Sequence, residues 1–375
     1  MRGYQQIRGL GSRHAITLIT PEPPASARAG IAELEPFCRM ILVPAPAWRR
    51  ILQLAQFPFS QLPAQTLFFY LRAFNQAISR ALAESSFDLI HVLLARMGPA
   101  ILSARGIPSV MDMVDTLSLN MRRRAQREAP VTRLLLGFET GRLTRYEREL
   151  GECYDRILVT SPADREALSS PANATVLPLG VDLERFPFRE DGRETQRIVF
   201  TGRMAYFPNA DAADYLAREI FPRVRREAKD ATLEIVGVNP PPKVRALGRM
   251  PGVQIIADSD LPPYIARAAV AAAPLRSGTG IQLKVLEAMA SGAPVVGTSF
   301  VAPAIAARNG EQWFLADQPE EYAARVIQLL KDRPLARRMA RSARRMIEER
   351  YSVGRLADDL ERIWTETAGG KRAVS

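Results

Sequence analysis

The sequence predicts an α/β fold built from two doubly wound, Rossmann-like parallel-sheet domains. In both halves of the chain, short apolar runs of strand length alternate with helical stretches, which is typical of parallel sheets covered by helices. A chain of 375 residues is long enough for two domains of ordinary size, each with its own core. A polar stretch at 189–196 separates the two series of strands.

The composition is that of a soluble globular protein, with 47% hydrophobic and 24% charged residues. No run reaches the roughly 18 apolar residues that span a bilayer, and the N-terminus lacks the apolar region of a signal peptide, so we expect a cytoplasmic protein. Cys38 and Cys153 have neither metal-ligand nor disulfide spacing and are expected to be buried thiols. With His14 and His91 as its two histidines, the chain does not favour a histidine-built metal site or triad.

The net charge of +11 implies an anionic partner. A nucleic acid is not expected, because the sequence has no aromatic–basic repeat, zinc pattern or helical reader. An anionic membrane surface is the other candidate, and an arginine-rich solvated surface is the alternative that needs no partner. Part of the excess charge lies in one region, at Arg122, Arg123, Arg124, Arg127, Arg133, Arg142 and Arg145.

The first half of the chain predicts five strands with their helices. Strands are expected at 15–20, 40–43, 87–94, 108–114 and 156–160, and helices at 4–10, 66–83, up to 104, at 139–150 and from Ser161. The segment 48–60 is apolar and carries two arginines. Its large side chains either face a membrane or an acceptor groove, or form ordinary core, which is the commoner outcome. They are Trp48, Leu52, Phe57 and Phe59.

Polar residues lie on two of these strands or just after them. His91 is on the strand 87–94, and Asp112, Asp115 and Ser118 lie at the carboxyl end of the strand 108–114. Open parallel sheets bind their ligands at this edge, so these residues are candidates for binding a ligand.

The second half predicts the same alternation. Strands are expected at 197–200, 233–238, 253–256, 270–275, 295–298 and 313–316, and helices from Asp211, after Gly280, from Pro319 and at 353–366.

The stretch SGTGIQLKVLEAMASGAPVV at 277–296 is the most informative part of the chain. Thr279 and Gln282 form a capping box that predicts the helix start, and Gly292 predicts its left-handed C-terminal cap. A glycine turn that opens a helix favours a phosphate or diphosphate, because free N–H groups and the helix dipole point at it. Lys284 and Glu287 share one face of this helix, where they bind a phosphate and a ribose, or form an i,i+3 surface ion pair.

The residues 278–296 resemble the donor-site signature of retaining GT-B glycosyltransferases of family 4. The resemblance covers nearly the whole chain and is tightest at 197–298. It implies that the helix start binds the diphosphate of a nucleotide sugar and that Glu287 holds the ribose. The family's second glutamate, eight residues earlier, is replaced by Thr279, as in a branch with a Gly-Thr-Gly-Ile-Gln loop and a lysine found among exopolysaccharide sugar transferases.

By this resemblance, residues 1–185 form the acceptor-side domain, 186–350 the donor-binding domain, and 351–375 a helix that crosses back to the first domain, then a tail. Arg203 stands where the family places a phosphate-binding arginine, and Tyr206 to Asn209 replace the family's usual lysine, for which Lys284 substitutes. The expected catalytic residues are Arg203, Lys284 and Glu287. The expected donor-binding residues are Gly202, Arg203, Asn209, Thr279, Gly280, Ile281, Lys284 and Glu287, and the acceptor-side residues are His91, Asp115 and Ser118.

The resemblance implies a bacterial enzyme that moves a sugar, with retention, from a nucleotide-diphosphate sugar to a glycan or lipid-linked acceptor in exopolysaccharide or cell-surface glycan synthesis. It implies no cofactor besides the donor and no metal, since the loop with Asp258 and Asp260 cups the base in resembling proteins. The enzyme is expected in the cytoplasm, peripheral to the inner face of the plasma membrane. The alternatives are a sugar-nucleotide epimerase-like enzyme and a degenerate nucleotide-sugar-binding protein. A dinucleotide oxidoreductase is disfavoured, because the glycine pairs at 9–11 and 278–280 lack a third glycine.

Proteins with this resemblance begin with a strand and a glycine-rich loop before a helix like 4–10. The first strand of the N-terminal domain is therefore expected to be missing from the sequence. We expect a form extended upstream by about 20 to 25 residues, one strand and its loop, to be more stable and more active.

Overall fold

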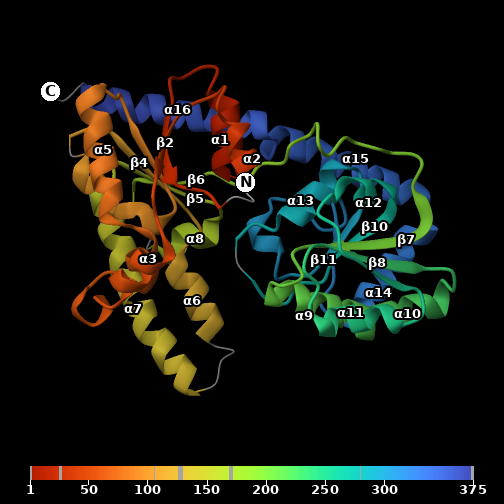
Figure 1. Cartoon of the computed structure of the whole chain (residues 1–375). Helices are drawn as coiled ribbons and strands as arrows, with labels where there is room; N and C mark the ends of the chain where they lie inside the picture. Colours follow the sequence, from red (N-terminus) through yellow and green to blue (C-terminus); the bar gives the residue numbers. More distant parts are fainter. Residues whose placement is uncertain are drawn as a thin grey trace. The chain divides into compact units, whose positions relative to one another are not determined.

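The computed structural model describes residues 2–24, 28–104, 106–125, 130–168, 172–278 and 280–372. The chain forms two compact units, Met1–Pro178 with Leu356–Ser375, and Leu179–Arg355 (Figure 1). The sequence placed the first division at 185/186 and the second at 350/351, whereas the structure divides the chain at 178/179 and 355/356. Both units are α/β with parallel sheets, as predicted.

The strands of the first unit form two separate parallel sheets. The strands are β1 (Thr17–Pro21), β2 (Arg39–Val43), β3 (Ile90–Leu93), β4 (Ser109–Val114), β5 (Arg156–Val159) and β6 (Ala174–Val176). Among the described residues, β1 pairs with β2, and β3, β4, β5 and β6 pair in that order, with no ladder between β1 and β3. Every residue of β1 is only partly buried, whereas five of the six residues of β4 are buried. Within the described residues, β1 therefore has a strand partner on one edge only.

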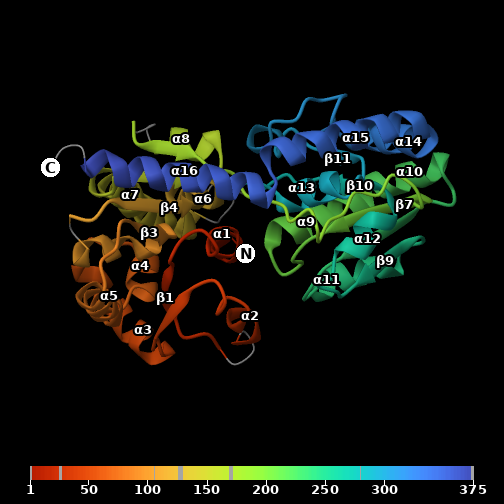
Figure 2. The same ribbon diagram turned by 90° about the horizontal axis from the view of Figure 1, so that it is seen from above.

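The alternation of side chains along β4 and β5 divides the first unit into two apolar layers. Val110 and Leu158 pack with α1 (Arg2–Leu10) and α16 (Val353–Arg372). Met111 and Ile157 face the opposite layer, which includes α5 (Arg72–Glu84) and α7 (Pro130–Cys153). In Figure 2, α1 and α16 lie on the same side of β3 and β4.

Several helices of the first unit differ from the sequence prediction. The expected helix 66–83 is two helices, α4 (Ala64–Phe69) and α5, because Tyr70 and Leu71 are buried in extended conformations between them. Cys153 is exposed at the end of α7, so the prediction of two buried thiols was wrong for this residue. The segment 48–60 forms α3 (Ala47–Leu54) and the short helix η2 (Phe57–Phe59), and contributes no buried side chain, so core was the wrong interpretation.

The shorter elements of the first unit complete its frame. They are α2 (Arg28–Ala32), η3 (Ala95–Ser103), α6 (Leu117–Ala125) and α8 (Pro162–Ala167). Ser161 caps α8 by accepting a hydrogen bond from the N–H of Asp164, which confirms the predicted helix start.

The second unit contains a single six-stranded parallel sheet. Its strands are β7 (Glu194–Thr201), β8 (Thr232–Val236), β9 (Val253–Ile256), β10 (Ala268–Ala273), β11 (Val295–Gly297) and β12 (Phe314–Leu315), in the order β12-β11-β10-β7-β8-β9. The order reverses direction between β7 and β10, and this switch point is where open α/β sheets bind ligands.

Helices cover both faces of this sheet (Figure 1). One face carries α9 (Phe207–Tyr215), α10 (Phe221–Glu227), α11 (Pro242–Arg245) and α14 (Pro319–Lys331), and the other carries α12 (Pro262–Arg267), α13 (Leu283–Ala290) and α15 (Arg333–Arg350). The short helices η4 (Leu216–Ile220), η5 (Ala246–Arg249) and η6 (Ala302–Ala304) lie between them in the chain. Buried Tyr322 fixes α14 to the sheet, since its hydroxyl accepts from the N–H of Ala273 and donates to the carbonyl of Val296.

Candidate functional site

Two loops at the carboxyl ends of β7 and β8 approach each other more closely than side chains would allow. Gly202 follows β7 and Gly237 follows β8, and a Cβ atom on Gly237 would lie 1.7 Å from the carbonyl oxygen of Gly202. The N–H of Gly202 donates to Val236 over 3.0 Å. Glycine is therefore required at 237 to bring these loops together.

The side chain of Lys284 links the first of these loops to α9 and α13. Its Nζ donates a hydrogen bond to Oδ1 of Asn209 and lies 4.8 Å from the centre of the Phe200 ring. A Cβ on Gly202 would be 3.0 Å from the same Nζ. Nδ2 of Asn209 donates to the carbonyl of Arg203 over 3.0 Å, so the loop after β7 is held by the same amide. The structure thus brings Gly202, Asn209 and Lys284 together.

The burial of Lys284 and Glu287 shifts the pKa values of both side chains. Burial lowers the pKa of Lys284 to about 7, and the charge of Glu287, one turn further along α13, acts in the opposite direction. Burial raises the pKa of Glu287, against the attraction of Arg185 and Lys284. A cation and a carboxylate with little water around them therefore project from one helix, next to a glycine loop.

The start of α13 differs from the prediction. The helix begins at Leu283 with Gln282 as its N-cap, without a capping hydrogen bond from that side chain. Gly278 and Gly280 have φ angles of 124° and 64°, and Gln282 is extended, so residues 280–282 precede the helix. Thr279, the predicted cap and donor residue, lies outside the described residues. The predicted C-terminal cap is confirmed, since Gly292 has a φ of 79°.

The other expected donor residues are placed as follows. Ile281 is buried, whereas Arg203 is exposed, and its guanidinium makes no hydrogen bond or ion pair within the part of the chain that the structure describes. Asp258 is occupied by its own loop, accepting from the N–H of Asp260 and from the hydroxyl of Tyr264. No group of three or more histidine, cysteine or acidic side chains suited to a metal ion is found among the described residues.

A second cluster of polar groups lies along β3 and β4 in the first unit. Asp112 is fully buried and accepts from Nε of Arg2 over 2.6 Å and from the amide of Gln6 over 2.8 Å. His91 accepts at Nδ1 from the indole N–H of Trp364 over 2.9 Å, and its Nε2 is 3.8 Å from the Asp112 carboxylate. Burial lowers the pKa of His91 to about 4, so this imidazole is neutral at physiological pH.

Asp115 differs from Asp112 in that no cation among the described residues is bonded to it. Its carboxylate accepts from Thr160 over 3.3 Å, and burial, followed by the charge of Asp164, raises its pKa to about 6. Val114 before it has a φ of 67°, an unusual conformation for a β-branched residue that indicates local strain. Ser118 does not join this group, because it is fully buried and its N–H donates to Glu147.

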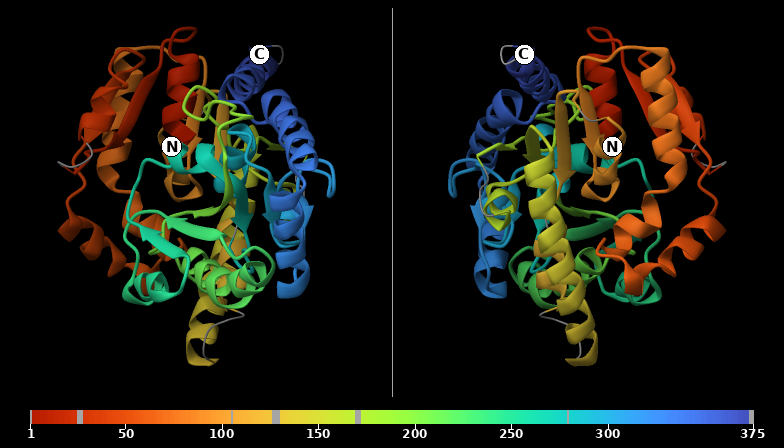
Figure 3. Two further views of the ribbon diagram at one scale, coloured as in Figure 1. Left: turned by 90° about the vertical axis from the view of Figure 1, so that its right-hand side faces the viewer. Right: turned by 90° about the vertical axis from the view of Figure 1, so that its left-hand side faces the viewer.

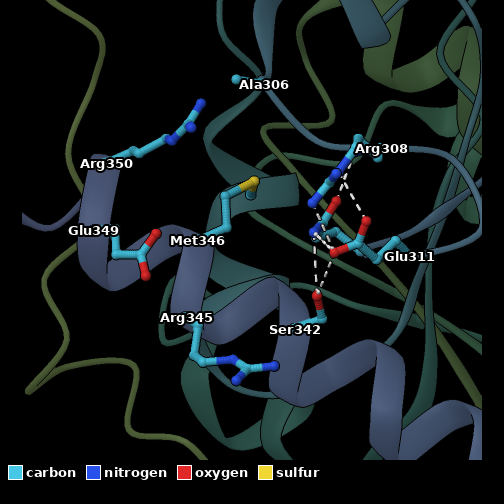
Figure 4. A pocket seen from close by; sticks show the side chains of 9 residues that line it. Ala306, Arg308, Glu311, Ser342, Arg345, Met346, Glu349 and Arg350 are labelled. Atoms are coloured by element: carbon cyan, nitrogen blue, oxygen red, sulfur yellow. Dashed lines mark hydrogen bonds and ion pairs between the residues drawn. The ribbon is translucent and has the colours of Figure 1, made fainter.

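A cavity of about 550 Å³ in the second unit is not at the glycine loops (Figure 4). It lies between α15, with Arg345, Glu349 and Arg350, and the loop before β12, where Arg308 pairs with Glu311. This loop leads into the amino end of β12, so the cavity is at the sheet edge opposite to the glycine loops. Its charged side chains are exposed and of both signs, so we place the candidate site at the glycine loops.

Sequence reasoning did not identify several residues of these two clusters. Gly237 ended an apolar strand run, and a glycine there signals a close backbone approach that we did not use. Phe200 was an ordinary strand residue in the sequence. Arg2, Gln6 and Trp364 come from the two ends of the chain, and no local pattern indicates that they meet beside Asp112 and His91.

Comparisons with known proteins indicate one family. A family model described as "Glycosyl transferases group 1" matches residues 195–332, and another, "Glycosyl transferase 4-like domain", matches residues 3–180. A D-inositol 3-phosphate glycosyltransferase from Acidothermus cellulolyticus is 26% identical over 308 residues, which cover 73% of this chain and 67% of that protein.

Similar solved structures agree with the fold. Sucrose-phosphate synthase from Thermosynechococcus elongatus superposes with a TM-score of 0.70 at 18% identity, covering 98% of this chain and 92% of that one. HepE from Anabaena, solved in complex with UDP and glucose, gives a TM-score of 0.65 at 13% identity, with 97% and 94% covered.

We predict that Gly237→Ala destabilises the second unit. The added methyl meets the backbone oxygen of Gly202, which cannot rotate away, so the cost should reach or exceed the ~1–3 kcal/mol typical of overpacking. Chemical unfolding of the variant measures it. Gly354→Ala is the matched control, because a Cβ there meets no atom within 4 Å. Equal stability of the Gly237 variant and the wild type would contradict the close approach of the two loops.

We also predict that Lys284 makes stability depend on pH. Between about pH 7 and about pH 10.5 the unfolded chain binds a proton on this amine that the folded chain has lost, so stability rises with pH. The unfolding free energy of the wild type minus that of Lys284→Met should therefore increase with pH, by at most about 1.4 kcal/mol per pH unit. Urea unfolding from about pH 7.5 to about 9.5 measures this difference. Lys229→Met is the control for removing an exposed lysine. If the free-energy difference for Lys284→Met does not change with pH, the amine of Lys284 is not enclosed.

Proposed function

Because this chain belongs to the group 1 (family 4) glycosyltransferases of the GT-B fold, we propose that it transfers a sugar with retention of configuration from a nucleotide-diphosphate sugar to a hydroxyl acceptor. The observation that carries this proposal is the enclosed Lys284 beside the loop of Gly202 and the amide of Asn209. A desolvated ammonium at the switch point of a parallel sheet favours a diphosphate, whose charge would compensate it. Glu287, one turn further on, is suited to accept hydrogen bonds from both hydroxyls of a ribose.

In the proposed reaction, the bond between the anomeric carbon and the donor phosphate oxygen breaks. The acceptor oxygen bonds to the anomeric carbon on the same face, and its proton passes to the departing phosphate. The protein's contribution is to orient both substrates and to stabilise the negative charge that develops on the leaving diphosphate. Lys284 and the N–H groups at the start of α13 would supply this stabilisation, and the exposed Arg203 would join them when the donor is bound. We propose that this requires no metal ion.

We further propose a glycan or lipid-linked acceptor and a role in exopolysaccharide or cell-surface glycan synthesis, in the bacterial cytoplasm at the inner face of the plasma membrane. The acceptor would bind in the first unit near Asp115. This carboxylate accepts hydrogen bonds from hydroxyl groups when it is ionised, and no cation in the described part of the chain is bonded to it. No helix among the described residues is long and apolar enough to cross a membrane.

Glu287→Gln should weaken binding of the donor nucleotide about tenfold with little change in unfolding free energy, because a charged hydrogen-bond acceptor is lost while the helix remains. Calorimetric titration with UDP, GDP and ADP identifies the base and measures the change. UDP comes first because the structurally similar HepE was solved with it. Unchanged nucleotide affinity would contradict the ribose role.

Lys284→Met should lower the rate of sugar transfer more than it lowers donor affinity, because developing charge on the diphosphate is greatest in the transition state. Steady-state transfer rates and donor titrations on the same variant separate the two effects. Activity in excess chelator tests metal independence. A larger loss of affinity than of rate would assign Lys284 to ground-state binding, and donor binding without transfer or hydrolysis to any acceptor would favour a binding protein.

A further inference from the structure

One side of the first unit exposes an unusual set of large apolar side chains. On α3, Trp48, Ile51 and Leu52 are 58%, 62% and 62% exposed, and they share one face of the helix because they are three and four residues apart. Phe59, in η2 directly after α3, is 93% exposed. Large side chains such as these are normally buried, and together they exceed the scattered apolar residues of an ordinary surface.

The same surface continues onto α7. Leu134 and Phe138, one turn apart on that helix, are 77% and 62% exposed. The guanidinium of Arg142 joins α7 to η2, since it lies 4.2 Å from the centre of the Phe57 ring and 4.9 Å from that of Phe138. It also donates to the carbonyl of Phe57 over 3.1 Å. We name this surface the α3–η2–α7 face; its exposed apolar members are Trp48, Ile51, Leu52, Phe59, Leu134 and Phe138.

Figure 3 shows α6 and α7 projecting from the sheet of the first unit. The projecting helices present Leu134 and Phe138 well away from the packed core, because Leu143 and Leu150 are the buried leucines further along α7. Leu134 and Phe138 therefore lie on the part of α7 that projects from the first unit.

The charged side chains in the part of the chain that contains α3 and η2 have one sign. Residues 36–83, which include α3 and η2, contain five arginines and no aspartate or glutamate. The guanidinium of Arg49 lies 5.1 Å from the centre of the Trp48 ring, so a cation accompanies the aromatic group at the surface. The acidic group nearest along α7, Glu139, is turned toward the protein and accepts from the N–H of Ala64 over 2.8 Å.

We propose that the α3–η2–α7 face docks the first unit on an anionic lipid bilayer, with its aromatic and aliphatic side chains in the interface and its arginines against lipid phosphates. Amphipathic helices with basic and aromatic residues bind membranes in this way, parallel to the surface. This inference rests on the proposed lipid-linked acceptor, which it would bring to the enzyme. A second copy of the chain is the less suitable occupant, because a two-fold interface would set arginine-rich surfaces against each other.

A matched control is available on another side of the same unit. Leu102, in η3, is 59% exposed, which is similar to the exposure of Phe138. The helix η3 packs at Gly98 against Tyr146 and Leu150, in the C-terminal half of α7. Leu150 is twelve residues beyond Phe138, about 18 Å along the helix axis, so Leu102 lies outside the proposed face.

The test is sedimentation of the full chain with vesicles of phosphatidylglycerol and phosphatidylcholine, or of phosphatidylcholine alone, over a series of salt concentrations. The wild type and Leu102→Ser should bind the anionic vesicles alike, and the binding should weaken with salt. The double variant Phe59→Ser with Phe138→Ser should bind at least about tenfold less, because the apolar contribution is lost. Arg49→Gln should bind less to anionic vesicles and unchanged to neutral ones.

The outcomes separate this inference from the proposed function. UDP titration and thermal unfolding of each variant show that the fold and the donor site are intact, independently of lipid. Equal vesicle binding by the double variant and Leu102→Ser, or wild-type binding that ignores lipid charge, would overturn the docking face even if the enzyme transfers sugar. A wild-type dimer in gel filtration that the double variant dissolves would assign the face to a second copy instead. Vesicle binding without any sugar transfer would leave the face in place and remove the proposed activity.

Discussion

The enclosed ammonium group of Lys284 is the constraint on which the second unit depends. Removing a cation from water disfavours its charge, and the lowered pKa of this lysine reflects that cost. The enclosure exists because Gly202 and Gly237 let two strand-end loops meet, and because Asn209 offers an acceptor from the neighbouring helix. An anion bound beside Lys284 would favour the protonated form of its amine, which burial disfavours. If the proposed diphosphate binds here, its binding and the protonation of Lys284 are linked.

In the first unit, by contrast, the buried charge of Asp112 has a bonded partner of opposite charge. Asp112 is fully buried, but Arg2 and Gln6 from α1 satisfy it, and burial keeps His91 beside it neutral while Trp364 donates to its Nδ1. The two ends of the chain thus contribute to this cluster, since three of its side chains come from α1 and α16. Asp115 is the exception: it follows the strained backbone of Val114 at the strand end, and none of the described residues supplies it with a bonded cation. A carboxylate in that position retains hydrogen-bonding capacity for a hydroxyl group.

The sequence predicted the second unit better than the first, for physical reasons. Its strands are short, largely apolar runs, and β10 is buried along its whole length, so their positions in the chain were readable to within two or three residues at most boundaries. Lys284 and Glu287 were identified by helical spacing and by the resemblance of their motif. The start of α13 was not, because the conformation of Gly280 overrides the capping pattern. The bonds of Arg2 and Trp364 to residues more than a hundred positions away leave no local signal. The break between α4 and α5 follows from the burial of Tyr70 and Leu71, which helical periodicity does not report.

Periodicity also cannot show what covers an apolar helix face, and this limits any interpretation of residues 48–60. Trp48, Ile51 and Leu52 have the spacing of core residues, and in a chain of this composition core was the reasonable expectation. The structure adds what the pattern lacks, namely that Arg142 occupies the space over the Phe57 and Phe138 rings. A guanidinium held there by a backbone carbonyl opposes collapse of these rings onto the core, since the collapse would bury its charge.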